Sequence, residues 1–208
     1  MLWSAIWLGI AAGAVHAGTG PDHVAGVAPF AARRGRAAWK TGAAWGIGHA
    51  GGALASAAVA LALRAHVPGV EESLSAWSER IVGVLLCLIG ALGLRRILRA
   101  PVLAGAAGHA HAEPPASDRS VFGLGLVHGA AGLSHLFGTL PALALPGTLL
   151  PAVFLAGYGA GSLAVITVFA AGIGHFAPAS EPRLRRRVVA FACASSLAIG
   201  LLWLVHPI

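Results

Sequence analysis

The sequence HAGTGPDH, residues 16–23, places two histidines, an aspartate, two glycines and a proline inside an otherwise apolar segment. Asp22 is the single Asp, Glu, Lys or Arg in residues 1–32. A carboxylate is costly in hydrocarbon, and Gly and Pro both weaken the helix that would carry it. This stretch therefore predicts a membrane helix that is kinked or broken at depth, with its polar side chains gathered at the interruption.

The composition indicates a membrane protein with several spans. Only 10% of the 208 residues are charged, whereas a typical soluble domain has about 25%. The mean hydropathy is +0.80. The first residues, MLWSAIWLGI, lack the basic region of a cleaved signal peptide, so we expect a permanent first span. A lipid bilayer is the expected environment of the chain.

The positive net charge does not predict a nucleic-acid partner. The charge of +7 comes from short basic clusters that separate apolar segments, and not from one continuous basic face. Cys87 and Cys193 both lie in apolar segments, which favours buried structural thiols over a disulfide framework. The small residues of GVLLCLIG, residues 83–90, suit helix packing within one chain or between two, so a homo-oligomer stays open.

Six transmembrane helices are predicted, since each crossing needs about 20 apolar residues. Residues 120–180 contain no Asp, Glu, Lys or Arg and are too long for one span, and prolines at 141, 146 and 151 divide them into two. The expected fold class is all-α integral membrane, with spans at residues 2–28, 41–63, 77–98, 120–140, 151–174 and 188–206.

The basic residues predict the orientation of these spans. Twelve of the 14 Lys and Arg residues lie in or beside the three loops that would share one side of the membrane: Arg33, Arg34, Arg36, Lys40, Arg95, Arg96, Arg99, Arg119, Arg183, Arg185, Arg186 and Arg187. Such loops are normally cytoplasmic. We therefore expect a multi-pass protein of a bacterial inner membrane with both termini outside.

An internal repeat relates the two halves of the chain. Residues 13–29, GAVHAGTGPDHVAGVAP, match residues 125–141, GLVHGAAGLSHLFGTLP, at seven of seventeen positions, including both histidines. Further along, WGIGHAGG aligns with YGAGSLAV and sets His49 opposite Ser162. Since three spans follow three, the copies would enter the membrane from opposite sides. This is a 3+3 inverted-topology repeat, with the first and fourth helices broken or kinked.

The repeat also predicts the organisation of the chain. We expect a first three-helix repeat over residues 1–100, a cytoplasmic linker over 101–118 and a second three-helix repeat over 119–208. The linker contains His109 and His111, which suit loose metal binding, although a flexible connection without a fixed role is the preferred interpretation. Inverted repeats usually place the substrate site near the bilayer midplane, where the broken helices meet.

Six polar residues at depth are the candidate metal ligands: His16, Asp22, His23, His49, His128 and His135. Residues seven apart on an intact helix lie about 10 Å apart along its axis, so His16 and His23 can share an ion only if GTGP breaks the helix. Neutral imidazoles with one carboxylate suit Ni²⁺, Co²⁺ or Zn²⁺ better than Mg²⁺ or Ca²⁺. No catalytic residue and no resident cofactor are expected, and His66, His175 and His206 receive no role.

These motifs resemble the nickel/cobalt transporter family, particularly its shorter permease-like members. The family has a signature helix with His, four residues and Asp-His; here HAGTGPDHVAGVAP has five residues between. GIGHAG, residues 46–51, is similar to the family's Gly-His-Ser helix, and the His128/His135 segment to its second-half motif. The resemblance implies transport of Ni²⁺ or Co²⁺ as substrate through the His/Asp site, and no enzymatic activity.

Three alternatives remain open from the residues themselves. A related transporter could carry another small solute, such as an organic anion. The paired histidines of each half could hold haem between helices. Ser162 in GAGSL, with buried histidines and six spans, could belong to an intramembrane hydrolase, although rhomboid-type proteases use Gly-x-Ser-Gly and here Leu163 follows the serine.

Overall fold

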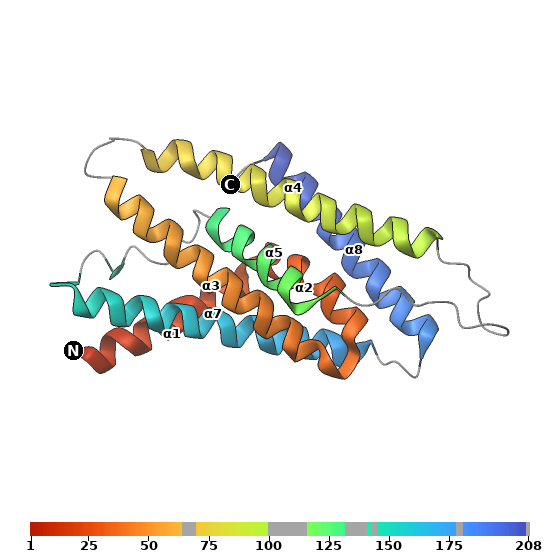
Figure 1. Ribbon diagram of the computed structural model, residues 1–208, viewed down its shortest axis with the longest axis horizontal. Coiled ribbons are helices and arrows are strands. Elements are labelled where there is room, and N and C mark those ends of the chain that lie inside the picture. The colour runs from red at the N-terminus through yellow and green to blue at the C-terminus, as the bar shows by residue number, and fades with distance from the viewer. Residues whose placement is uncertain (64–69, 100–115, 132–140, 143–144, 178–180, 207–208) are drawn as a thin grey trace.

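The structure is a computed structural model that describes residues 1–63, 70–99, 116–131, 141–142, 145–177 and 181–206. Within these residues every regular element is a helix, which confirms the all-α class. Figure 1 shows most of the helices as long rods lying side by side. Residues 101–115 of the proposed linker, the segment with His135 and the residues around His66 lie outside the described ranges, whereas Asp118, expected at the end of the linker, begins a helix.

The first predicted span is broken at Gly20. Helix α1 covers Leu2–Thr19 and helix α2 covers Pro21–Arg34, while Gly20 between them has extended φ and ψ angles of −77° and 107°. Pro21 is the first residue of α2, the one helical position where its missing N–H costs nothing. The prediction of an interrupted helix is confirmed here.

The loop expected after this span is largely helical, which corrects the sequence prediction. Helix α2 runs six residues beyond the expected end at Ala28, and the 3-10 turn η1, Gly35–Ala37, leads directly into α3, Ala38–Leu63. Gly35 has a φ of +54°, a backbone conformation that residues other than glycine rarely adopt. A single glycine can therefore reverse the chain where a longer loop was expected.

Four further helices complete the described part of the chain: α4, Val70–Arg99; α5, Asp118–Ala131; α7, Leu149–Phe176; and α8, Pro182–Val205. Four helices are long and apolar enough to cross a membrane, namely α1, the Glu79–Arg99 part of α4, α7 and α8. The expected count of six spans is thus not confirmed among the described residues. The described α5 has 14 residues, and α3 carries Lys40, Thr41 and His49.

Glycines let α1 lie directly against the backbone of α7. A Cβ atom on Gly13 would meet the carbonyl oxygen of Tyr158, and one on Gly161 would meet that of Ile10. Contacts later in α1 are made with residues later in α7, so the two helices run parallel. Close approach through residues four apart is the usual device of helix pairs in membranes, where small side chains replace the hydrophobic effect.

Helices α3 and α5 form a second parallel pair in the same way. A Cβ atom on Gly48 would meet the Phe122 carbonyl oxygen, and one on Gly125 would meet the Trp45 carbonyl oxygen. Helix α3 also packs against α7 in the opposite direction, with Gly42 beside Thr167. Among these four helices α7 and α3 are therefore the inner two, with α1 packed against α7 and α5 against α3.

The remaining long helices, α4 and α8, pack against each other and are joined to the rest by α2. Gly90 of α4 approaches the Cys193 carbonyl oxygen of α8 at a point where a Cβ atom would come within 2.6 Å. Ser196 of α8 donates a hydrogen bond to the Ala25 carbonyl oxygen of α2 at 2.6 Å. Both cysteines are free thiols, and Cys193 is buried, as predicted.

The close glycine contacts of α1 with α7 and of α3 with α5, which we call the two glycine seams, predict a matched set of stability effects. Gly161→Ala and Gly48→Ala should each force two backbones apart and lower the free energy of unfolding by about 1–3 kcal/mol, the usual effect of overpacking. Thermal unfolding of the purified protein in detergent, followed by circular dichroism, measures this. Gly172→Ala in α7 is the control, because a Cβ atom there has no neighbour within 4 Å. Equal melting temperatures for all three variants would contradict the packing described.

Candidate metal centre

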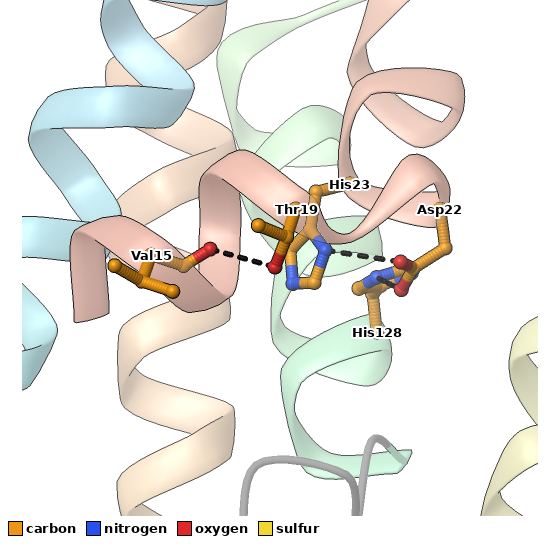
Figure 2. A network of polar contacts seen from close by, with 5 residues as sticks. All are labelled: Val15, Thr19, Asp22, His23 and His128. Carbon is orange, nitrogen blue, oxygen red and sulfur yellow. Dashed lines mark hydrogen bonds and ion pairs between the residues drawn. The ribbon is translucent and has the colours of Figure 1, made fainter. Parts of the chain in front are cut away.

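The Asp22 carboxylate joins two histidines from different parts of the chain. Its Oδ1 atom lies 3.1 Å from Nδ1 of His23, and its Oδ2 atom lies 3.0 Å from Nε2 of His128 (Figure 2). All three side chains are buried, with exposed fractions of 4%, 2% and 1%. An ionised carboxylate only accepts hydrogen bonds, so both imidazoles donate to it. Asp22 thereby fixes which nitrogen of each ring carries a proton.

Gly20 leaves the space that this arrangement needs. A Cβ atom at position 20 would collide with the Nδ1 atom of His23 and come within 2.8 Å of Asp22 Oδ1. The sequence suggested that the glycines relax the backbone, and at Gly20 the structure adds a steric reason. Gly18 lacks that role, since its nearest neighbour would be a Val165 methyl carbon at 3.9 Å.

Three imidazoles from three helices meet beside this carboxylate. The ring centroid of His23 in α2 lies 4.6 Å from that of His16 in α1 and 4.7 Å from that of His49 in α3, and the centroids of His16 and His49 are 6.0 Å apart. One nitrogen from each ring lies within 4.8 Å of the other two. We call these three residues the imidazole triad. Its assembly depends on the break at Gly20, as the sequence predicted.

A second group of possible ligands shares one member with the triad. One ligand atom from each of Asp22, His23 and His128 also lies within 4.8 Å of the others. In this group, however, the close atoms are already paired through the two hydrogen bonds to Asp22. Metal-binding histidines commonly donate their second ring N–H to a carboxylate, which orients the ring. This geometry favours the triad as the inner ligands and Asp22 as their outer support.

The centre lies at mid-height of the helices that surround it. His49 is near the middle of the 26-residue α3, and Tyr158, whose ring centroid is 5.7 Å from that of His16, lies about a third of the way along the 28-residue α7. His49 is fully buried, whereas His16 is only half-buried. His16 is therefore the most exposed member of the triad.

Five of the six predicted ligands belong to this cluster, and His135 lies outside the described residues, as do His109 and His111. His175 and His206 are exposed. The sequence interpretation missed two buried aromatic neighbours, Tyr158 beside His16 and Trp45 beside His128, whose ring centroids lie 5.7 Å and 5.6 Å away. The internal alignment contained the signal, because WGIGHAGG and YGAGSLAV set these two residues opposite each other.

Ser162, the residue aligned with His49, serves helix packing. Its hydroxyl donates to the Gly13 carbonyl oxygen at 3.1 Å, and the side chain is completely buried. The hydroxyl is thus held in the contact between α7 and α1. This geometry gives the serine a structural partner and offers no support for it as a nucleophile.

Comparison with known proteins gives two relatives from Arabidopsis thaliana. The chain is 33% identical over 205 residues to "Chloroplast protein FOR GROWTH AND FERTILITY 2" and 32% identical over 211 residues to "Chloroplast protein FOR GROWTH AND FERTILITY 1". Each match covers 94% of this chain and 54% or 56% of the relative, so the chain spans about half the length of the curated relatives it matches. No family profile and no solved structure matches.

These relatives overturn the predicted function. The expectation of Ni²⁺ or Co²⁺ transport is wrong, because proteins similar over nearly the whole chain are named for chloroplast growth and fertility and not for metal transport. The error came from equating a transmembrane His/Asp cluster with a passage for ions. A cluster of buried metal-binding residue types does not by itself specify transport. The relatives are chloroplast proteins, so they give no support for a bacterial inner membrane.

The role of Asp22 can be tested with a matched pair of aspartates. Asp22→Asn leaves an amide that can accept from one ring only, so we expect the free energy of unfolding to fall by about 1–3 kcal/mol. Asp118→Asn is the control, since that carboxylate is 52% exposed in its ion pair with Arg34, and exposed pairs contribute about 0–1 kcal/mol. Chemical denaturation measures both. A larger loss at Asp118 than at Asp22 would contradict the central role of the buried carboxylate.

Proposed function

We propose that this chain is an integral membrane protein that retains a divalent transition-metal ion at the imidazole triad, with Zn²⁺ as the first candidate. The observation that carries the proposal is the approach of three histidine nitrogens, from α1, α2 and α3, to within 4.8 Å of one another. The proposed ion is a resident component and not a transported substrate. Its role is to hold three separate helices at one point.

The chemistry of the ligands supports a borderline transition metal. Neutral imidazoles bind Zn²⁺ at about 2.0–2.1 Å, so the triad needs only a modest contraction of the separations seen here. Mg²⁺ and Ca²⁺ prefer oxygen ligands, and the triad offers none. The Asp22 carboxylate, which accepts from His23, supplies a negative charge that partly balances the ion in a low-dielectric setting.

The proposed architecture is a 3+3 inverted repeat in which the ion lies near the bilayer midplane. The seams between helices support it: the contact of Gly13 with Tyr158 corresponds, under the internal alignment, to the contact of Gly125 with Trp45. Likewise Gly161 approaches Ile10 as Gly48 approaches Phe122. This relation predicts that Gly161→Ala and Gly48→Ala lower the free energy of unfolding equally. An unchanged free energy of unfolding in either variant would oppose it.

The surface of the helices also suits a membrane. Tryptophans near the ends of α1, α3 and α4 are exposed by half or more: Trp3, Trp7, Trp39 and Trp77. Two of them carry a basic neighbour over the ring, Lys40 at 5.7 Å and Arg80 at 5.6 Å. Tryptophan and basic side chains of this kind are enriched where helices leave the hydrocarbon.

Metal analysis of the purified protein tests the proposal. After dialysis against buffer without metal, we expect about one Zn²⁺ per chain, and His49→Ala should lose it because two imidazoles cannot hold the ion through dialysis. His128→Ala removes only outer support, so its affinity should fall by about 10–100-fold. The control is His175→Ala, which changes an exposed histidine of α7.

The outcomes separate clearly. Retained Zn²⁺ in wild type and His175→Ala, with loss in His49→Ala, supports the triad. A wild-type protein that binds no Zn²⁺, Co²⁺ or Ni²⁺ when each is supplied in excess contradicts the proposal. Equal retention by His49→Ala and wild type, at equal yield of folded protein, would place any bound ion elsewhere.

A further inference from the structure

Tyr158 is a buried phenol beside the imidazole triad whose hydroxyl has no hydrogen-bond partner among the described residues. The side chain is only 1% exposed, and its ring centroid lies 5.7 Å from that of His16. Buried tyrosine hydroxyls nearly always have a partner, because an unpaired polar group away from water is unfavourable. Since none of the described residues supplies this partner, the hydroxyl of Tyr158 is available to a bound group.

The position of Tyr158 in α7 places it between the two helices that contribute His16 and His49. On one side its backbone carbonyl faces Gly13 of α1, one turn before His16. On the other side the next residue, Gly159, packs against Ala50, which follows His49 in α3. The packing of α7 therefore holds Tyr158 at the level of the triad, and not toward either end of the helices.

The imidazole triad leaves one position of a tetrahedral ion unfilled. Zinc sites with three protein ligands keep the fourth place for water or another small ligand, whereas structural zinc sites use four. His128 bonds Asp22 through its Nε2 atom at 3.0 Å and belongs to the Asp22 group, not to the three residues of the triad. Tyr158 lies beside His16, which is the most exposed member of the triad.

We infer that the centre binds a small inorganic anion on the proposed metal ion, and that the Tyr158 hydroxyl donates a hydrogen bond to that anion. This inference rests on the proposed metal centre. An anion on a divalent ion would leave one positive charge, which the Asp22 carboxylate balances, so the buried assembly becomes neutral. The phenol then has its partner, and the fourth position is filled by a ligand other than the described residues of the triad.

The equivalent place in the second half carries no such hydroxyl. The internal alignment sets Trp45 opposite Tyr158, and Trp45 lies 5.6 Å from His128 as Tyr158 lies 5.7 Å from His16. The two halves thus share an aromatic side chain beside the first histidine of each repeat. The phenol comes from the second repeat and lies beside His16, a member of the triad, which is where an anion would need it.

The test uses Co²⁺ as a coloured substitute for Zn²⁺ and azide as the anion. In the Co²⁺-loaded protein, azide should change the visible d–d spectrum with saturation. Tyr158→Phe should still bind Co²⁺ and should weaken azide binding about tenfold, the effect of losing one hydrogen bond to a charged ligand. Phe154→Leu, which changes another buried aromatic side chain of α7, is the matched control and should bind azide like wild type.

A second readout uses the fact that Tyr158 is the one tyrosine in the sequence. With 3-fluorotyrosine incorporated, the protein should give a single ¹⁹F resonance that shifts when azide is added to the Zn²⁺-loaded form and stays unchanged without metal. Bound Co²⁺ with no spectral response to azide, or equal azide affinity in wild type and Tyr158→Phe, would overturn this inference and leave the metal centre intact. Failure to bind Co²⁺ or Zn²⁺ at all would overturn both.

Discussion

The buried carboxylate of Asp22 is the constraint on which the rest of the centre depends. It accepts from His23 and from His128, so it connects the first half of the chain to the second across 106 residues. Both oxygens are used, and the side chain is shielded from water. A charge in this position is stable only while both imidazoles remain in place. The interaction therefore requires α2 and α5 to meet at one height.

That requirement explains the broken first helix. A continuous helix would separate His16 and His23 by about 10 Å along its axis, whereas the extended Gly20 brings their ring centroids to 4.6 Å. Pro21 begins the new helix, and the absence of a side chain at position 20 leaves room for the His23 ring. The glycine seams of α1 with α7 and of α3 with α5 then bring His16, His49 and His128 to the same level.

The sequence predicted the parts of this structure that depend on local composition and on the internal repeat. HAGTGPDH indicated an interrupted helix and the convergence of His16, Asp22 and His23, because Gly and Pro act on the backbone directly. The sequence could not predict that Asp22 pairs with His23 and His128 while the triad forms beside it, since this depends on which nitrogen of His23 faces Asp22. Tyr158 was missed because its signal lies in the alignment of the two halves with Trp45, and not in the apolar helix around it. The predicted function was wrong because a cluster of metal-binding residue types does not by itself specify transport.

The most direct test of the central claim is X-ray absorption spectroscopy at the zinc edge of the Zn²⁺-loaded protein. The account predicts three imidazoles at about 2.0–2.1 Å, with the multiple-scattering pattern of histidine, and the same imidazole count in Asp22→Asn. That variant removes outer support and leaves the inner ligands in place. An inner shell with two imidazoles and a carboxylate oxygen that Asp22→Asn removes would contradict the account, because the ion would then occupy the group of Asp22, His23 and His128.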